Sequence, residues 1–285
     1  MLEKLDGSTR VYIIVGDPIA QVKSPNSMTR AFLDRGVNAI VVPMHVTAVD
    51  LDTLMQGVRL AENVDGVIVT VPHKFAAFAH CAETTDRACI LGAVNVIRRR
   101  EDGAWYGDML DGLGFVGGIR TAGHEPEGRR ALLVGAGGAG SAIALALVDE
   151  GVAELAIHDT STSRRDQLID RLRSARPDAV LTVGTADPTG FDLVVNATPT
   201  GMQAGDPLPL RADRFTSKMF VADVITKPAV TPLIEQARRA GCRTQVGAGM
   251  FYAEAYLMLD FLLAAHVTCN DKQELSREPS TVQVS

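Results

Sequence analysis

The sequence predicts an α/β protein with two domains, each built on a mainly parallel sheet. The chain has 285 residues, enough for two modest domains with separate cores. Segments typical of strands and helices alternate along most of it, which is the pattern of parallel sheets. A glycine fingerprint at residues 135–140 stands near the middle of the chain, so the long segment before it predicts a separate unit for the substrate.

The first 110 residues are expected to form a partly parallel sheet with covering helices. Strands are predicted at five short apolar segments, residues 11–15, 39–46, 66–71, 93–99 and 104–107. A helix follows the first strand, with Ser24 as N-cap, Pro25 at the first helical position and Gly36 just past the end. A second helix is predicted over residues 50–61. Residues 101–103, Glu-Asp-Gly, predict a hairpin turn.

The fingerprint Gly135-Ala136-Gly137-Gly138-Ala139-Gly140 lies between a predicted strand over 130–134 and a predicted helix over 141–149. Such a loop lets backbone N–H groups and a helix N-terminus face a pyrophosphate. Asp159 ends the next strand at the spacing where a ribose-binding carboxylate is expected. Together these features predict a bound dinucleotide, with Gly135, Gly137, Gly138, Ala139, Gly140 and Asp159 at the cofactor.

The alternation of strands and helices continues to the end of the second unit. Strands are predicted at 154–158, 179–183, 191–195, 219–224 and 243–246, with helices near 163–175 and 231–240. An apolar helix over 249–266 is expected to return to the first domain, followed by a loose polar tail from Asn270. We therefore expect residues 1–113 plus 248–285 to form the substrate domain, and residues 114–247 the dinucleotide-binding domain.

Composition excludes several classes of partner. The net charge of −6 and the pI near 5.5 argue against nucleic acid and anionic membranes. No signal peptide and no membrane-spanning segment is expected. The cysteines Cys81, Cys89, Cys242 and Cys269 show neither C-x-x-C spacing nor a metal-binding cluster, so we expect reduced thiols, a cytoplasmic protein and no metal. The chain is expected to be a monomer or a homodimer.

Two charged residues of the first half stand where catalytic side chains would be useful. Lys74 follows a buried strand and Pro72, and Asp111 lies at the start of the helix that leads into the second unit. Both positions fit the carboxyl edge of an open sheet, where ligands bind. A lysine and a carboxylate can manage the proton of a hydroxyl while hydride leaves it. The alternatives are a surface lysine and an N-capping aspartate.

Six ordered motifs resemble the shikimate dehydrogenase family. They run from about residue 11 to residue 261: Val15-Gly16-Asp17-Pro18-Ile19-Ala20 with Ser24-Pro25, Val69-Thr70-Val71-Pro72-His73-Lys74, Gly92-Ala93-Val94-Asn95, Gly107 with Asp111, Asn196-Ala197-Thr198-Pro199-Thr200-Gly201-Met202, and Gly247-Ala248-Gly249-Met250. The resemblance implies NAD(P)-dependent interconversion of a ring hydroxyl and a ketone, in a site between two domains.

The resemblance also implies roles for individual residues. Lys74 and Asp111 would form the catalytic pair, and Thr70 and Asn95 would lie at the substrate. The cofactor would be contacted by residues of the last two motifs, namely Thr198, Thr200, Gly201, Met202 and Gly249.

The chain departs from the family on the substrate side. The family loop Ser-x-Ser-Pro is Val22-Lys23-Ser24-Pro25 here, so one hydroxyl is lost, and Lys23 could replace it with a charge. Further apolar residues stand where the family has hydrogen-bonding side chains, at Ile68, Val96, Met109 and Leu110. Lost donors would leave substrate hydroxyls unpaired, at roughly 1–3 kcal/mol each. These changes predict a substrate other than shikimate itself.

Glu254 replaces the Gln usual in the last helix of the family and interrupts an apolar stripe. A buried carboxyl needs a partner or a raised pKa. It can be a structural group within the fold, or it can face the ligand and select an amine or a hydroxyl donor. We count it, with Val22, Lys23 and Ser24, among the expected substrate-binding residues.

The cofactor is expected to be NAD in preference to NADP. NADP-using members tend to carry Asn-Arg-Thr where this chain has His158-Asp159-Thr160, and a carboxylate accepts ribose hydroxyls but repels a 2′-phosphate. Arg164 and Arg165 lie close in sequence and could restore some NADP binding.

The sequence thus predicts an oxidoreductase that acts on a cyclic acid related to shikimate or quinate, amino-substituted or less hydroxylated. Two alternatives stay open, an authentic shikimate or quinate dehydrogenase and an inactive protein that senses a cofactor or a metabolite. Retention of both Lys74 and Asp111 argues against the sensor, since sensing needs no proton relay.

Overall fold

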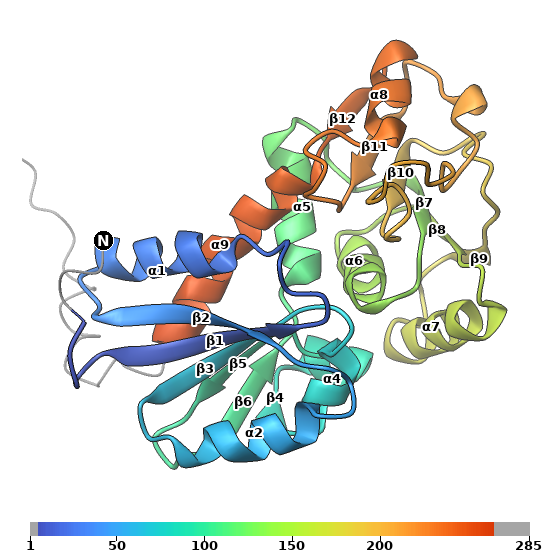
Figure 1. Cartoon of the computed structure of the whole chain (residues 1–285). Coiled ribbons are helices and arrows are strands. Elements are labelled where there is room, and N and C mark those ends of the chain that lie inside the picture. Colours follow the sequence, from blue (N-terminus) through green and yellow to red (C-terminus); the bar gives the residue numbers. More distant parts are fainter. Residues whose placement is uncertain (1–4, 265–285) are drawn as a thin grey trace, which may run out of the picture.

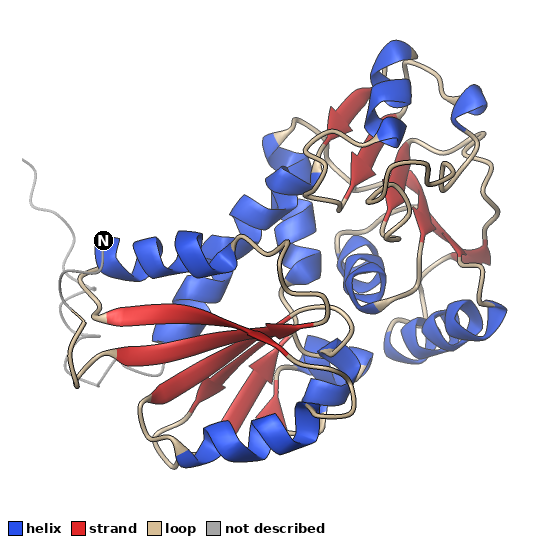
Figure 2. Ribbon diagram, in the orientation of Figure 1, coloured by secondary structure: helices blue, strands red, loops and turns tan. Residues whose placement is uncertain are grey.

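The computed structural model describes residues 5–264, which form two six-stranded sheets lying side by side (Figure 1). The first sheet has the strand order β2-β1-β3-β5-β6-β4, and the second has the order β12-β11-β10-β7-β8-β9. Helices flank both sheets (Figure 2). The predicted α/β class with two parallel-rich sheets is therefore confirmed.

The first sheet is mixed, because only the two pairs made by its fourth strand in spatial order are antiparallel. Its strands are β1 (Arg10–Gly16), β2 (Ala39–His45), β3 (Val64–Val69), β4 (Glu83–Thr84), β5 (Val96–Arg99) and β6 (Trp105–Asp108). β1 pairs in parallel with β2 and β3, whereas β5 runs antiparallel to both β3 and β6. β5 and β6 are joined through the Glu101-Asp102-Gly103 turn, as predicted. The strand β3 ends two residues earlier than expected, which leaves Thr70 and Val71 in the loop before Lys74.

Four helices belong to the first half: α1 (Ser24–Asp34), α2 (Leu51–Leu60), α3 (Lys74–Phe78) and α4 (Asp86–Leu91). The prediction of Ser24 as N-cap is wrong. The backbone of Lys23 is already close to helical, so Lys23 takes the N-cap position, without a side-chain cap, and Ser24 and Pro25 become the first helical residues. The short helices α3 and α4 were not predicted.

The second sheet is wholly parallel. Its strands are β7 (Arg130–Val134), β8 (Glu154–His158), β9 (Leu181–Val183), β10 (Leu193–Asn196), β11 (Phe220–Asp223) and β12 (Arg243–Gln245). The connecting helices are α6 (Gly138–Asp149), α7 (Thr162–Ala175), α8 (Pro232–Arg239) and the 3₁₀ turn η1 (Ala212–Arg214). The strand order reverses between β7 and β10, and open sheets bind ligands at such a switch point.

Two long helices connect the halves. α5 (Asp111–Thr121) leads from β6 to the second sheet, and α9 (Gly247–Leu263) leaves β12 to pack against α5, α1 and β5 (Figure 1). The expected domain borders at 113/114 and 247/248 fall inside these helices. The predicted helix end at His266, Cys269 and the tail from Asn270 lie outside the described residues.

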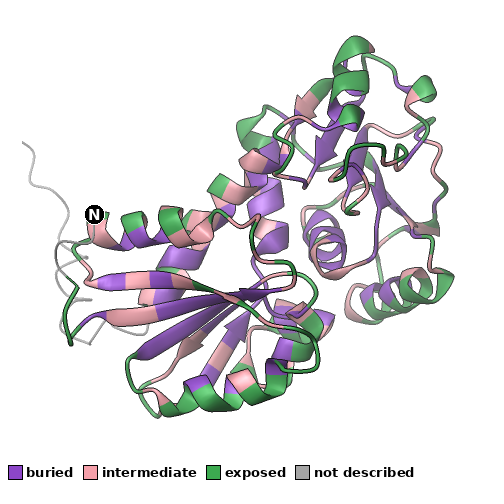
Figure 3. Ribbon diagram, viewed as in Figure 1, coloured by how far each residue is buried: buried purple, intermediate pink, exposed green. Residues whose placement is uncertain are grey.

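Burial follows the two sheets, whose central strands are covered on both faces while helices α2 and α7 expose their outer sides (Figure 3). Within residues 5–264, no helix is both long and apolar enough to span a membrane. In the same part of the chain, no three His, Cys, Asp or Glu side chains converge in a way that could hold a metal ion.

Candidate active site

A lysine and an aspartate meet at the carboxyl edge of the first sheet. Lys74 is the first residue of α3, directly after the loop that follows β3, and Asp111 is the first residue of α5. The Nζ atom of Lys74 donates to Oδ2 of Asp111 in a mostly buried ion pair. Asp111 is not an N-cap, because Leu110 holds that position and Asp111 is itself helical. The structure therefore brings together the two charged residues singled out from the sequence.

Asn95 joins this pair to a second carboxyl. It precedes β5 and is fully buried. Its Nδ2 donates to Oδ1 of Asp111 at 2.7 Å and also to Oε1 of Glu254. Its Oδ1 accepts from the backbone N–H of Leu110 at 2.8 Å. Both ends of the amide are thus used within the protein, which fixes the position of the Asp111 carboxylate.

Glu254 lies on α9 with only 9% of its surface exposed. Gly114 of α5 makes room for it, because a Cβ at that position would come within 2.6 Å of the Glu254 Cβ. Burial and the neighbouring charge of Asp111 raise the pKa of Glu254 well above its usual value, against a smaller lowering by Lys74. We name Lys74, Asp111, Asn95 and Glu254 the cleft network.

The glycine loop after β7 reaches the cleft network from the second sheet. Gly135 has φ of +107°, and a Cβ at Gly140 would come within 2.0 Å of the Gly135 carbonyl oxygen, so both positions require glycine. A Cβ at Gly138, the first residue of α6, would lie 3.1 Å from Cδ of Lys74. The side chain of Lys74 therefore lies between its carboxylate partner and the glycine loop.

Asp159 follows β8 and is committed to its own loop. Its Oδ2 accepts from the backbone N–H of Ala136 at 2.7 Å, while Oδ1 accepts from the N–H of Ser161 at 2.7 Å and from Arg164 at 3.0 Å. Burial works to raise the pKa of Asp159, but these hydrogen bonds outweigh it and the pKa lies below its usual value. The carboxylate thus shapes the glycine loop and holds Arg164 beside it.

The other residues expected at the cofactor lie in the loop after β10 and at the start of α9. The N–H and the hydroxyl of Thr198 both donate to Oδ1 of Asn196, at 3.0 and 2.7 Å, and the N–H of Thr200 donates to the Thr198 hydroxyl at 3.2 Å. Gly201 has φ of +111° and its N–H donates to Asp206 at 2.9 Å; Met202 follows it. Gly249 lies in the first turn of α9, packed against Gln245.

On the substrate side, the loop before α1 reaches across to the second half. Nζ of Lys23 donates to the backbone carbonyl of Thr226, after β11, at 3.4 Å. Ser24 lies at the start of α1. Thr70, directly after β3, donates its N–H to the carbonyl of Val15 in β1. The bridge from Lys23 to Thr226 had no signal in the sequence, because a partner 203 residues away leaves no local pattern.

The apolar replacements expected to line the substrate pocket lie in the core. Ile68 and Val96 face each other across β3 and β5, and with Leu110 they join the apolar cluster around Phe32. Met109 is 1% exposed and packs in the main core cluster, and half-buried Val22 packs against the Ile68 cluster. These residues therefore contribute to core packing.

Gly114 and its neighbours are functional residues that sequence reasoning missed. Four glycines occur within α5, at Gly112, Gly114, Gly117 and Gly118. Glycine is unfavourable inside a helix, so such a cluster signals a close helix contact, here with α6 and α9. The glycine cluster was therefore a sequence signal for close packing on α5, although it does not identify the partner helix.

The comparison with known proteins decides the family. Residues 14–97 match the shikimate dehydrogenase substrate binding domain. A relative named shikimate dehydrogenase (NADP(+)) from Rubrobacter xylanophilus is 37% identical over 84% of this chain and 85% of its own length. The chain belongs to the shikimate dehydrogenase family. It is thus an NAD(P)-dependent dehydrogenase that acts on a CH–OH group.

Solved structures of the family superpose over nearly the whole chain. Shikimate 5-dehydrogenase from Thermus thermophilus, in complex with NADP(H) and shikimate, is 27% identical with a TM-score of 0.80, over 90% of this chain and 94% of that one. The ligand-free 5-ketofructose reductase of Gluconobacter sp. strain CHM43 is 28% identical with a TM-score of 0.78, over 90% and 93%. The solved structures similar to this chain therefore include an enzyme named for a substrate other than shikimate.

The expected preference for NAD is wrong. The curated relatives from Rubrobacter, Lysinibacillus and Geobacter are named as NADP(+) enzymes, and the Thermus structure holds NADP(H). The prediction rested on a free carboxylate at Asp159, but that carboxylate is occupied by two backbone N–H groups and by Arg164. The group presented beside the glycine loop is a guanidinium, which suits a 2′-phosphate.

Proposed function

We propose that the chain uses NADP⁺ to interconvert a secondary ring alcohol and its ketone, with Lys74 and Asp111 as the catalytic pair. One observation carries this proposal: Lys74 is ion-paired with Asp111 while its side chain lies against Gly138 of the glycine loop. A proton-handling group and a dinucleotide cradle thus share one cleft. NADP⁺ bound there would supply the hydride acceptor.

The loop around Gly137 fits a dinucleotide. Gly137 is the N-cap of α6, and nothing lies within 4 Å of a Cβ built on it, so the space above the loop is open. The loop N–H groups and the α6 N-terminus would hold the pyrophosphate. Thr198, Thr200, Gly201, Met202 and Gly249 would line the nicotinamide half, and Arg164 would meet the 2′-phosphate.

The proton moves through Lys74. In ketone reduction, the ammonium group of Lys74 donates a proton to the carbonyl oxygen as negative charge develops there. In alcohol oxidation the neutral amine takes the hydroxyl proton. Asp111 orients Lys74 and stabilises its charged form, and Asn95 keeps Asp111 from turning away. This retained pair argues against a protein that only senses metabolites.

The substrate we propose is a cyclic acid related to shikimate or quinate, held by the loop of Val22, Lys23 and Ser24 together with Thr70. The ammonium of Lys23 reaches the Thr226 carbonyl, and the adjacent start of α1 at Ser24 favours a carboxylate. Glu254 offers a hydroxyl or amine a carboxyl partner. A panel of shikimate, quinate, aminoshikimate and 5-ketofructose would rank the candidates by kcat/KM; a polyol without a carboxylate as best substrate would refute the cyclic acid.

Lys74→Ala tests the mechanism. We expect kcat on the best substrate of the panel to fall by about 10²–10⁴-fold, because the proton donor is lost, while NADP⁺ still binds. Lys218→Ala, at an exposed lysine before β11, is the matched control and should turn over like the wild type. Equal kcat in Lys74→Ala and the control would end the assignment of the catalytic pair.

A further inference from the structure

The cleft network contains two carboxyl groups and one cation. Lys74 is paired with Asp111, and Glu254 has no cation as its hydrogen-bond partner among the interactions of the described residues. Glu254 accepts from the neutral amide of Asn95, which also donates to Asp111. If both carboxyls were ionised, this buried cluster would carry a net negative charge.

The two carboxyls share one amide and one cation. Oε1 of Glu254 and Oδ1 of Asp111 both accept from Nδ2 of Asn95, so the two buried carboxyls lie on either side of the same amide nitrogen. A buried carboxyl that lies so close to a carboxylate, without a cation of its own, is stabilised by keeping its proton. Asp111 accepts from Lys74 and is the ionised partner, which leaves the proton on Glu254.

We propose that Glu254 is a positioning residue that works as a neutral carboxylic acid, and that turnover is lost when it gives up its proton. In the acid form of Glu254, one carboxyl oxygen accepts from Asn95 and the O–H donates to Asp111. These are the bonds that a glutamine amide would make, which explains how a carboxyl can stand where the family usually has Gln. Ionisation would turn the donor into a second negative charge beside Asp111 and pull Lys74 and Asn95 out of place.

The surroundings of Glu254 support a neutral acid. Burial and Asp111 both raise its pKa, and Lys74 is the one cation that lowers it. The other charged side chains on the elements packed against α9 form ion pairs, bind carbonyls or stack on rings away from Glu254: Arg30, Asp34, Arg35, Arg98, Arg99 and Arg120. The close approach at Gly114 packs Cα, Cβ and Cγ of Glu254 against α5.

The pH profile of Glu254→Gln tests this proposal, which rests on the proposed function of the same site. Gln keeps the acceptor and the donor but has no proton to lose. The assay runs in the direction of alcohol oxidation, in which Lys74 works as the neutral amine and gives no alkaline limb of its own. We expect wild-type kcat/KM to fall about tenfold per pH unit once Glu254 ionises, and this alkaline limb to be missing in Glu254→Gln. Asp260→Asn makes the same exchange at an exposed site on α9 and should keep the wild-type profile.

Two kinetic results would overturn the proposal. One is a Glu254→Gln profile that matches the wild type at every pH. The other is a folded Glu254→Gln protein, with wild-type NADP⁺ binding and Tm, that is inactive at every pH, since Gln should replace the acid.

A measurement on the wild type covers the case in which the variant does not fold. With carbon-13 at the glutamate side-chain carboxyl carbons, we expect one resonance to stay at the protonated position at neutral pH, while exposed glutamates ionise near pH 4.3. If every resonance titrates near that pH, Glu254 is ionised and the proposal fails. This reading needs no turnover, so failure of the Lys74 mechanism would be seen separately.

Discussion

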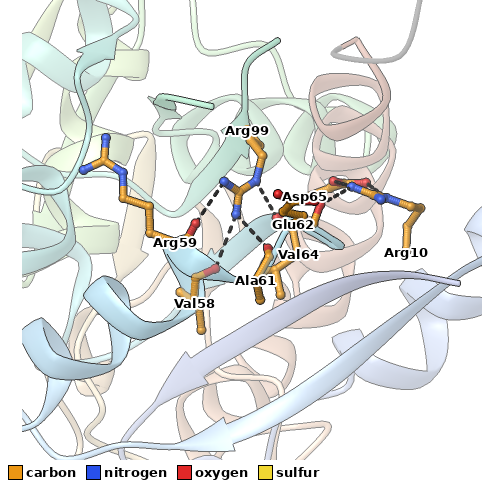
Figure 4. A network of polar contacts seen from close by, with 8 residues as sticks. All are labelled: Arg10, Val58, Arg59, Ala61, Glu62, Val64, Asp65 and Arg99. Atoms are coloured by element: carbon orange, nitrogen blue, oxygen red, sulfur yellow. Dashed lines mark hydrogen bonds and ion pairs between the residues drawn. The ribbon is translucent and has the colours of Figure 1, made fainter. Parts of the chain in front are cut away.

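Two polar networks lie at opposite ends of the strands of the first sheet. They differ in the ratio of positive to negative side chains. At the edge away from the cleft, Arg10 donates through Nε to Asp65 at 2.6 Å and through a second nitrogen to the same carboxylate (Figure 4). Arg99 lies beside this pair, and its guanidinium donates only to backbone carbonyls in the described structure, those of Val58, Arg59, Ala61 and Val64. We call these three side chains the rim network.

The rim network has two guanidiniums for one carboxylate. The guanidinium of Arg99 donates to the carbonyls at the C-terminal end of α2 and so connects this helix to the sheet. The cleft network has the opposite excess, with two carboxyls for one lysine. A guanidinium keeps its proton, so an excess of arginine only holds the fold together, whereas an excess of buried carboxyls binds a proton that can respond to substrate and pH. The difference separates structure from function better than burial does, because Asp65, Asp111 and Glu254 are all buried.

His124 sharpens this comparison, because it is a buried ionisable group with cations beside it. Its ring stacks on Phe220 with centroids 4.5 Å apart. Burial, and then Arg243, lower the pKa of His124 to about 4. The folded state therefore resists protonation, and stability that is complete above about pH 6.5 is lost as the pH falls towards 4, by up to roughly 3 kcal/mol.

His124→Phe keeps the stacked ring and removes the proton site. We expect the unfolding free energy of the wild type, measured with urea, to drop more steeply than that of the variant between pH 6.5 and pH 4. If the unfolding free energies of wild type and variant fall in parallel with pH, His124 is protonated at no cost in the folded protein. That result would contradict the link between burial beside cations and resistance to protonation.

Arg164 extends the comparison to the glycine loop, where its exposed guanidinium forms an ion pair with Asp159. If Arg164 meets the 2′-phosphate, Arg164→Ala should raise KM for NADP⁺ about tenfold, or about 1.4 kcal/mol. Arg173→Ala removes an exposed arginine from the same helix, α7, and is the control. Identical KM values for the two variants would place the phosphate elsewhere.

The sequence predicted the two sheets and the pair of Lys74 and Asp111, because strand periodicity and the carboxyl-edge rule are local signals. It could not predict that Asn95 donates to Glu254, 159 residues away, since that contact depends on how α9 returns to α5. The cofactor preference failed for a related reason. A sequence shows that Asp159 is acidic, but not that two backbone N–H groups and Arg164 already occupy its oxygens.

The most direct test compares Asp111→Asn with Asp65→Asn, the same exchange in the two networks. We expect Asp111→Asn to lower kcat by about 10²–10⁴-fold, because Lys74 loses the charge that orients it. Asp65→Asn should keep kcat and lower the unfolding free energy by about 1–2 kcal/mol, because Arg10 loses its charged acceptor but can rehydrate. Full turnover in Asp111→Asn, or equal loss of activity in both variants, would contradict the assignment of the cleft network as the active site.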